Sequence, residues 1–491
     1  MDDFEYLLEK YKEVGYVTSL VSFVATVSGL PDLKDGELVL TESGARGLVV
    51  GLKENEAEVL ILEEGEIKVG ERVVRSGEPF KIGVSQNLLG RIINPLSQPV
   101  DGKGPIKREK FCEIQSSAPS VIERKRINEN LETGVAIVDL LIPIGYGQRE
   151  LVIGDAKTGK TIFLLQTIAN QVRKGVVCVY VGIGKKDVAI RQVEEYLKKQ
   201  GVFEKVVIVY APADDPPPLL YLAPYSGMTI AEYFRNLNKK VLIVFDDLTT
   251  HAQIYRQISL ILKRPPGRDC YPGDIFHIHA SLLERAGCIK KDGKEMSITA
   301  LPVAETFEGD ISGYIQTNLM AMTDGHIFFD INEFRKGKRP AINPFLSVSR
   351  VGIQTKTQIE KELANWIREK LYAFEQVSEL RQLATELPKE TQRLIDLARK
   401  IEIILQQSPQ ELIERGAQII LFGLLLTNFW ENKPESKLIK EKETLLKLWG
   451  ESKVPQLREK ISEIQGIEHL KFLIEEIKPE IEKLLKENAN T

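Results

Sequence analysis

Short runs rich in β-branched residues, separated by Gly, Asp, Asn and Glu, occupy the chain from Gly15 to about residue 80. Closely spaced runs of this kind are typical of a small barrel or sandwich. The residues before them, MDDFEYLLEKYKEV, are acidic and have a helical pattern. We therefore expect a short N-terminal arm helix over 1–13 and a β-barrel over 14–80. The predicted strands lie in YVTSLVSFVATVSGL, GELVLT, ARGLVVGL, AEVLILE and ERVVRSG.

From residue 81 to about 355 the pattern changes to continuous apolar runs that alternate with helical segments. Continuous apolar strands spaced by helices predict a parallel sheet that is covered on both faces. The predicted strands are ELVIG (150–154), VVCVYVGI (176–183), KVVIVYA (205–211) and VLIVFDDL (241–248).

From about residue 356 to 491 the β pattern disappears, and apolar residues recur at spacings of three and four. This periodicity predicts a bundle of amphipathic helices. The fold class is therefore multidomain: a small N-terminal β-barrel, a central α/β domain with a parallel sheet, and a C-terminal α-helical bundle. The longest apolar run, IILFGLLLTNFW (419–430), is shorter than the ~20 residues that span a bilayer, so we expect membrane contact only through partners.

Composition and charge exclude several function classes. The 491 residues include 66 basic and 70 acidic side chains, a net charge of -4, which gives no reason to expect nucleic-acid binding. The start of the chain lacks the features of a signal or transit peptide. None of the four cysteines stands in a CxxC pair, which favours free thiols in a reducing compartment.

The segment GDAKTGKT fits the phosphate-binding pattern GxxxxGK[ST], with a predicted strand before it and a helix after it. In such a loop the glycines allow a tight turn, so that backbone N–H groups and the helix N-terminus face phosphate oxygens. The lysine supplies a point charge for the β- and γ-phosphates, and the final threonine offers a hydroxyl to Mg²⁺. The predicted nucleotide-binding residues are Gly154, Asp155, Ala156, Lys157, Thr158, Gly159, Lys160 and Thr161.

The segment VLIVFDDL (241–248) supplies a companion acid after its apolar residues. Asp246 would reach Mg²⁺ directly or through water, and Asp247 is the weaker candidate. The alternative for this pair is a helix N-cap with a solvated neighbour.

Hydrolysis also needs a group that orients water and takes its proton, usually a carboxylate or amide at a strand end beside the loop. Here the strand after the loop's helix ends in VGIG, and Lys185 follows. A cation cannot serve as that base unless its pKa falls steeply. Asp187 is the remaining carboxylate nearby, and we expect it not to act as the base. The residues therefore predict a site that binds ATP and keeps it.

Several longer segments resemble the α subunit of the rotary proton-translocating ATP synthase. The α type is favoured over the β type because the β subunit has a Gly/Ala-rich loop ending in VGKT and a catalytic glutamate at the position of Lys185. Glutamine is usual there in α subunits, so lysine departs in the non-catalytic direction. The segments are LLGRIINPLSQPVDGKGPI, IPIGYGQRELVIGDAKTGKT, YLAPYSGMTIAEYFR, DDLTTHAQIYRQISLILKRPPGRDCYPGDIFHIHASLLERA, ITALPVAET, TDGHIFF and RPAINPFLSVSRVG.

The resemblance implies an alternating α3β3 ring around a central shaft, with a non-catalytic site for Mg²⁺ and ATP or ADP in each α chain. The implied partners are β subunits, the shaft subunit γ, and the peripheral-stalk subunits δ and b. The implied location is peripheral, on the cytoplasmic face of a bacterial plasma membrane or the equivalent face of an organelle. The ring couples ATP synthesis or hydrolysis to proton transport, and the isolated α chain is expected to be inactive.

The resemblance also assigns residues. Arg350, in SVSRVG, matches the arginine that reaches the γ-phosphate in the neighbouring β subunit, where a planar cation stabilises transition-state charge. Phe334 and Arg339 match residues near the adenine. Gln407 is the better candidate for a base contact from the helical domain and Gln406 the second; for both, a solvated surface position is the alternative.

Some segments depart from the family pattern. Ala156 and Lys157 stand where Arg and Gln are usual, and the loop around Gln407 is about two residues short. The N-terminal arm is shortened, and roughly one helical turn is missing near 380–385. Two other hypotheses remain: a catalytic subunit of a related hexameric ATPase, which predicts a carboxylate in place of Lys185, and a scaffold with a vestigial site, which predicts a damaged loop.

Overall fold

The computed structural model describes residues 3–488 except 64–66, 292, 381–387 and 452–454. The chain forms two compact units, each assembled from separate segments. Unit 1 contains residues 1–126, 146–156 and 171–324, and unit 2 contains 127–145, 157–170 and 325–491. The departure expected near 380–385 falls largely within 381–387, outside the described residues.

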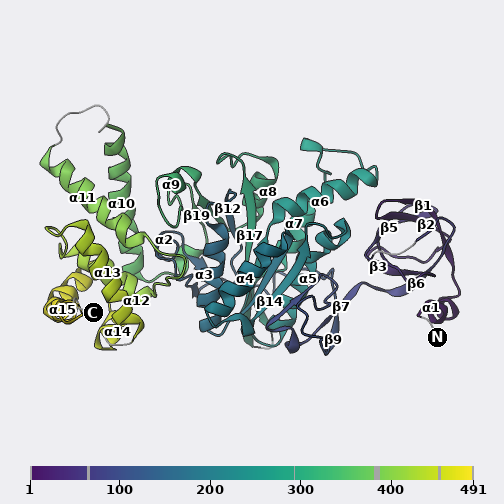
Figure 1. Cartoon of the computed structure of the whole chain (residues 1–491), viewed down its shortest axis with the longest axis horizontal. Helices are drawn as coiled ribbons and strands as arrows, with labels where there is room; N and C mark the ends of the chain where they lie inside the picture. Colours follow the sequence, from purple (N-terminus) through teal and green to yellow (C-terminus); the bar gives the residue numbers. More distant parts are fainter. Residues whose placement is uncertain (1–2, 64–66, 292, 381–387, 452–454, 489–491) are drawn as a thin grey trace. The chain divides into compact units, whose positions relative to one another are not determined.

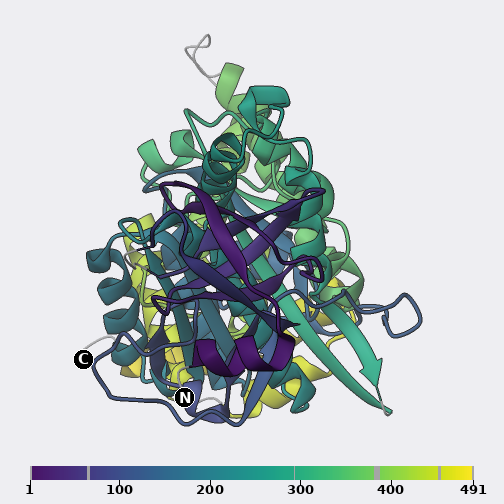
Figure 2. The same ribbon diagram turned by 90° about the vertical axis from the view of Figure 1, so that its right-hand side faces the viewer.

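Unit 1 begins with a helix and a closed barrel, drawn in purple in Figures 1 and 2. The strands are hydrogen-bonded in the order β1-β2-β5-β4-β3-β6, and β1 pairs with β6 to close the ring. Alternate side chains such as Val17, Val39 and Val59 point inward and are at most 2% exposed. The elements are α1 (Asp3–Tyr11), which packs on β6, and β1 (Gly15–Val21), β2 (Val24–Ser28), β3 (Glu37–Thr41), β4 (Arg46–Leu52), β5 (Glu56–Ile61) and β6 (Arg72–Pro79).

The rest of unit 1 is built around parallel strands in the order β12, β17, β15, β13, β14 and β8, with β16 antiparallel to β17. All residues of β15 are buried, so helices and loops cover both faces of this strand. The strands are β8 (Arg91–Ile93), β12 (Glu150–Asp155), β13 (Val177–Lys185), β14 (Val206–Pro212), β15 (Val241–Asp246), β16 (Gly287–Lys291) and β17 (Lys294–Thr306).

Helices connect these strands, as the alternating sequence pattern predicts, and α5 packs on β13, β14, β15 and β17. The helices are α4 (Asp187–Lys199), α5 (Pro217–Asn236), α6 (Leu248–Ile261), α7 (Ile275–Glu284) and α8 (Tyr314–Met322). A separate antiparallel pair joins β7 (Lys81–Val84) to β9 (Lys110–Glu113).

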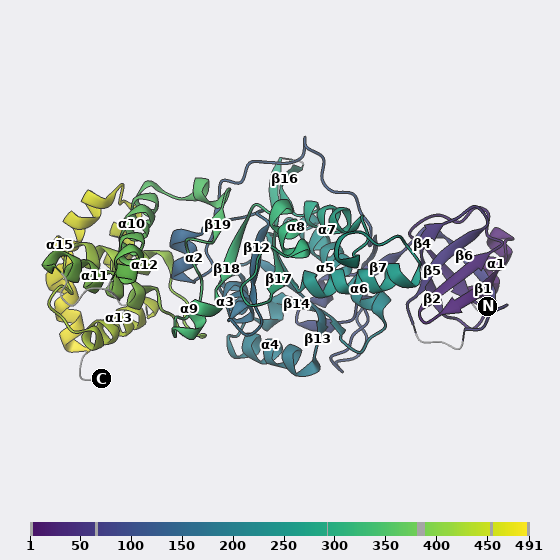
Figure 3. The same ribbon diagram turned by 90° about the horizontal axis from the view of Figure 1, so that it is seen from above.

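Unit 2 is mainly helical, and its C-terminal helices appear in green and yellow in Figure 3. The apolar run around 419–430 forms most of α12, which packs against α13, α14 and α15. The helices are α2 (Ala136–Leu141), most of α3 (Lys160–Arg173), α9 (Ile331–Arg335), α10 (Gln358–Leu380), α11 (Lys389–Leu405), α12 (Arg415–Leu426), α13 (Glu435–Gly450), α14 (Pro455–Ser462) and α15 (Ile467–Glu487).

Short strand pairs complete unit 2: β10 (Asn130–Leu131) with β11 (Ile144–Gly145), and β18 (Gly325–Phe329) with β19 (Val348–Ser349). The barrel, the parallel sheet and the helical region confirm the predicted fold class. The boundaries proposed at residues 13, 80 and 355 remain predictions. Among the described helices, none combines the length and apolar character needed to cross a bilayer.

Candidate functional site

The carboxyl ends of four parallel strands in unit 1 meet at one edge of the sheet. Gly154 of β12 lies opposite Glu305 of β17, and Asp246 of β15 lies opposite Gly182 of β13. In open α/β sheets this edge is where ligands bind. The residues that follow these strand ends are therefore the first candidates for a site.

The predicted phosphate loop leaves this edge at the end of β12. The strand ends at Asp155, and helix α3 begins at Lys160. Gly159 has φ +104°, a left-handed conformation in which a glycine avoids steric strain. The boundary between the two units passes through the loop, since Ala156 belongs to unit 1 and Lys157 to unit 2.

On the unit 1 side of the loop, the Asp155 carboxylate is engaged within its own unit. Its Oδ1 accepts a hydrogen bond from the Thr306 hydroxyl and a second from the Gly309 N–H at 2.9 Å. The Asp155 side chain thus fixes the segment that follows β17. Its backbone N–H is the group that suits phosphate binding.

On the unit 2 side, the loop leads directly into a helix N-terminus. Thr158 and Lys160 are buried, with 1% and 7% exposure, and Thr161 is exposed. The Phe163 N–H donates to the Gly159 carbonyl at 3.1 Å, and the Phe163 and Phe329 rings pack 5.8 Å apart. The first turn of α3 is therefore anchored, and N–H groups and a dipole end suited to an anion lie there.

The Lys185 ammonium, at the end of β13, lies between Asp246, the last residue of β15, and Asp247, which follows it. Its Nζ is 2.7 Å from Asp246 Oδ1 and 2.9 Å from Asp247 Oδ2. Burial acts to lower the pKa of Lys185, but the charges of both carboxylates outweigh it and raise the pKa above its usual value. Lys185 therefore stays protonated at neutral pH and cannot act as a general base.

The remaining carboxylate oxygens of the pair also have donors. The Tyr180 hydroxyl donates to Asp246 Oδ2 at 2.7 Å, and the Thr250 N–H donates to Asp247 Oδ1 at 2.7 Å. Asp247 is the N-cap of α6, which is the alternative to metal binding considered for this pair. Asp246 is the acid that faces both Lys185 and Tyr180.

Asp187, the other carboxylate considered as a base, is held by a tyrosine. The Tyr210 hydroxyl lies 2.7 Å from Asp187 Oδ1 and 3.0 Å from the Lys185 carbonyl. The first contact ties the start of α4 to β14, and the second ties the end of β13 to β14.

A cavity of about 570 Å³ lies within unit 2, and two of the four residues assigned to the adenine line it. The Arg339 guanidinium lies over the Phe334 ring, 3.6 Å from its centroid, and donates to the Phe334 carbonyl at 2.9 Å. Arg339 and Gln406 line the cavity. Its other walls include the apolar side chains of Ile137, Pro340, Phe345, Leu371 and Phe374.

Gln407 has a different environment from Gln406. Its side-chain oxygen accepts from the Ala136 N–H at 2.6 Å, and its side-chain nitrogen donates to the Gly134 carbonyl at 2.9 Å. It is 5% exposed, whereas Gln406 is exposed. Gln406 lines the cavity, whereas the side chain of Gln407 is held by the backbone at Gly134 and Ala136.

Arg350 follows the short strand β19. Along this strand, side chains alternate between the buried and the exposed side. Ser347 and Ser349 are each 7% exposed, and the Ser349 hydroxyl donates to the Pro143 carbonyl at 2.5 Å. Val348 and Arg350 are on the exposed side. An exposed position suits a residue that is expected to act on a neighbouring chain.

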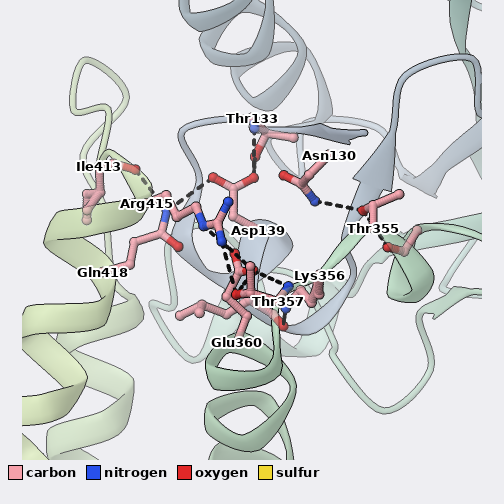
Figure 4. Close-up of polar contacts among 12 residues, drawn as sticks. Asn130, Thr133, Asp139, Thr355, Lys356, Thr357, Glu360, Ile413, Arg415 and Gln418 are labelled. Carbon is pink, nitrogen blue, oxygen red and sulfur yellow. Dashed lines mark hydrogen bonds and ion pairs between the residues drawn. The ribbon is translucent and has the colours of Figure 1, made fainter. Parts of the chain in front are cut away.

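A buried polar cluster in unit 2, shown in Figure 4, has no counterpart in the sequence predictions. Asp139 accepts from the Thr133 and Gly134 N–H groups at 2.7 and 3.0 Å and from Gln418 Nε2 at 3.1 Å. Burial raises the pKa of Asp139 to about 6. The Thr133 and Gly134 donors are local, but Gln418 lies 279 residues away in the chain, and residue spacing carries no signal for that contact.

Comparisons with known proteins agree over most of the chain. Residues 134–349 match the nucleotide-binding domain of the ATP synthase alpha/beta family, and residues 354–487 match the C-terminal domain of the ATP synthase alpha/beta chain. Proteins named ATP synthase subunit alpha from Staphylococcus aureus strains RF122 / ET3-1 and JH9 are 40% identical over 456 residues. The match covers 93% of this chain and 91% of each relative.

Proposed function

The chain belongs to the ATP synthase alpha/beta family, with α subunits among its relatives, and we propose that it holds ATP or ADP without hydrolysing it. The observation that carries this proposal is the contact of Lys185 with Asp246 and Asp247. In-line attack by water needs a group that accepts a proton at this strand end. Here the group is a protonated ammonium whose pKa is raised, so water is not activated.

The phosphates of the nucleotide are bound by the loop Gly154–Thr161. Backbone N–H groups of Asp155, Ala156, Lys157, Thr158 and Gly159 face the phosphate oxygens, and Lys160 supplies a positive charge. The hydroxyl of Thr161 and the carboxylate of Asp246 are the proposed Mg²⁺ contacts. Each oxygen of Asp246 accepts from one donor and keeps a second lone pair, so Asp246 contacts Mg²⁺ directly or through water.

The base of the nucleotide occupies the cavity lined by Arg339 and Gln406. A guanidinium stacked on Phe334 presents a flat cationic surface, which suits a purine ring. The cavity volume of about 570 Å³ lies within the range of small-molecule sites.

Arg350 serves a different site, in the neighbouring subunit. Its guanidinium reaches the γ-phosphate bound by β and stabilises the charge that spreads over the phosphate oxygens in the transition state. Support comes from its exposed position and from the buried hydroxyls of Ser347 and Ser349, which fix the strand that precedes it.

The assembly is an alternating α3β3 ring that encloses the shaft subunit γ and meets the stalk subunits δ and b. This ring couples ATP synthesis or hydrolysis to proton transport across a membrane that the chain itself does not enter. The proposed location is the cytoplasmic face of a bacterial plasma membrane, or the equivalent face in an organelle. The N-terminal barrel and α1 are the candidates for stalk contact.

The purified chain provides the test. We expect it to bind ATP and to release no phosphate above background, and to support steady hydrolysis once a β partner is added. Phosphate release by the pure chain at the rate of the mixture would instead identify a catalytic subunit. Absence of nucleotide binding would identify a scaffold with a vestigial site.

A further inference from the structure

The carboxylates of Asp246 and Asp247 have all four oxygens engaged by donors from unit 1. Lys185 takes one oxygen of each, Tyr180 takes the second oxygen of Asp246, and the Thr250 N–H takes the second oxygen of Asp247. The two carboxylate side chains are 6% and 3% exposed, and Lys185 is 21% exposed.

Two buried carboxylates side by side require a counter-charge, because both lose hydration and repel each other. Divalent cations commonly meet this need with oxygen ligands. Here an ammonium at 2.7 and 2.9 Å provides the positive charge from within the chain. An ammonium has three N–H donors, of which the two carboxylates accept two, so one can be given to a phosphate oxygen.

The Lys185 ammonium and the phosphate loop both follow strands of the same sheet. β13 and β15 are hydrogen-bonded neighbours, β17 follows β15, and β12 follows β17. Because the strands are parallel, the end of β13 at Lys185 and the end of β12 at Asp155 lie on the same edge. The cation therefore belongs to the edge from which the phosphate loop departs.

Building on the proposed function, we propose that Lys185 is a built-in counter-cation that lets this site hold a nucleoside di- or triphosphate without a divalent metal. The metal-free anion and the metal complex then bind with similar affinity. Mg²⁺ contributes through Thr161, the phosphates and water, and its removal does not empty the site. Lys185 offsets one of the two negative charges of Asp246 and Asp247 whether or not a metal is present.

Tyr180 keeps this arrangement in place. Tyr180 is buried within β13, and its hydroxyl donates to Asp246 Oδ2, which leaves Oδ1 for Lys185. A Lys185→Gln variant removes the cation and leaves the carboxylate pair with Tyr180 and the Thr250 N–H. In that variant a divalent metal becomes the available counter-charge.

The test measures ATP affinity of the full chain by calorimetric titration in excess Mg²⁺ and again in excess EDTA. The comparison within the wild type needs no variant. Lys185→Gln is the informative variant, and Lys186→Gln, one residue further along and exposed, is the matched control.

The wild type and Lys186→Gln are expected to lose less than about threefold in affinity when the metal is removed, and Lys185→Gln about tenfold or more, an increment of ~1.4 kcal/mol or above. A wild type that loses as much as Lys185→Gln overturns the counter-cation role while leaving nucleotide binding intact. A wild type that binds no ATP even in Mg²⁺ overturns the proposed function itself, and the counter-cation role with it.

Discussion

The Arg339 guanidinium covers one face of the Phe334 ring at 3.6 Å from the centroid, and Arg339 also lines the cavity of about 570 Å³ in unit 2. The Phe334 ring therefore sets the orientation of the Arg339 guanidinium. A cation held flat against a ring is well placed to contact a purine on its other face.

This relationship predicts the effect of Phe334→Ala. We expect ATP affinity to fall about tenfold, because the Arg339 guanidinium loses the ring that orients it toward the base, while affinity for inorganic tripolyphosphate stays unchanged. Titration of both ligands checks this. Equal losses for the two ligands would place Phe334 away from the base.

Alanine substitutions at the neighbouring residues Gln406 and Gln407 should have different effects on ATP binding and on stability. Gln407→Ala leaves the Ala136 N–H and the Gly134 carbonyl without their side-chain partner, and we expect about 2 kcal/mol or more of lost stability. Gln406→Ala should weaken ATP binding and leave stability within about 0.5 kcal/mol. Denaturant unfolding and ATP titration of both variants separate the two roles, and a reversed pattern would refute the assignment.

Arg350→Ala should leave nucleotide binding by the isolated chain unchanged and lower ATPase of the assembled ring by about 10³–10⁵, the contribution of such arginines in related enzymes. Arg335→Ala, another exposed arginine of unit 2, is the control and should keep full activity. Normal turnover of the assembled Arg350→Ala ring would remove the role in trans.

A resident nucleotide should stabilise the chain. A ligand that binds only the folded state contributes about 4 kcal/mol at a thousandfold excess over its Kd. Lys160→Ala should therefore abolish most of the rise in Tm that ATP produces, and lower assembly yield more than it lowers the chemical step. The measurement is a melting curve with and without ATP. If the ATP-induced shift persisted while catalysis by the ring collapsed, the stabilising role would be wrong.

Lys356 predicts a pH dependence of stability. Burial lowers its pKa from 10.5 to about 8, opposed by the charges of Glu360 and Asp139 and assisted by those of Arg368 and Arg415. The folded state releases this proton before the unfolded state does, so the free energy of unfolding should rise between about pH 8 and 10.5, by roughly 3 kcal/mol at most.

The matched comparison uses Lys356→Met, which keeps the length of the side chain and removes the titrating amine. Urea unfolding at several pH values should show that the free energy of unfolding of the wild type rises relative to that of the variant between about pH 8 and 10.5. Parallel curves would mean that Lys356 has the same pKa folded and unfolded. The Lys356 Nζ donates to the Leu140 carbonyl, so both forms of the amine retain that neighbour.

Local motifs could be predicted from the sequence, and long-range pairings could not. The phosphate loop and Asp246 each end a recognisable apolar strand, so their places at strand ends were predictable, and Arg350 was picked out by the SVSRVG signature. β17 was not among the predicted strands because Lys294–Thr306 mixes polar residues with apolar ones and contains Pro302, which is unusual in a central strand. In the structure it lies between β12 and β15.

The side-chain contacts of the site needed the structure for a similar reason. Tyr180 sits in an apolar strand, and its bond to Asp246 spans 66 residues of sequence. Gln407 turns inward because Gly134 and Ala136, some 270 residues earlier, present backbone groups to it. Such pairings arise from tertiary packing, and residue spacing carries no signal for them.

The closure of β1 onto β6 has a consequence for recognition between chains. An open sheet can recruit a neighbour through backbone hydrogen bonds alone, which any extended polypeptide can supply. The described strands of this barrel complete one another, so adjoining subunits must recognise it through side chains. Because the barrel is closed, the specificity of subunit contacts at its surface depends on the amino-acid side chains there.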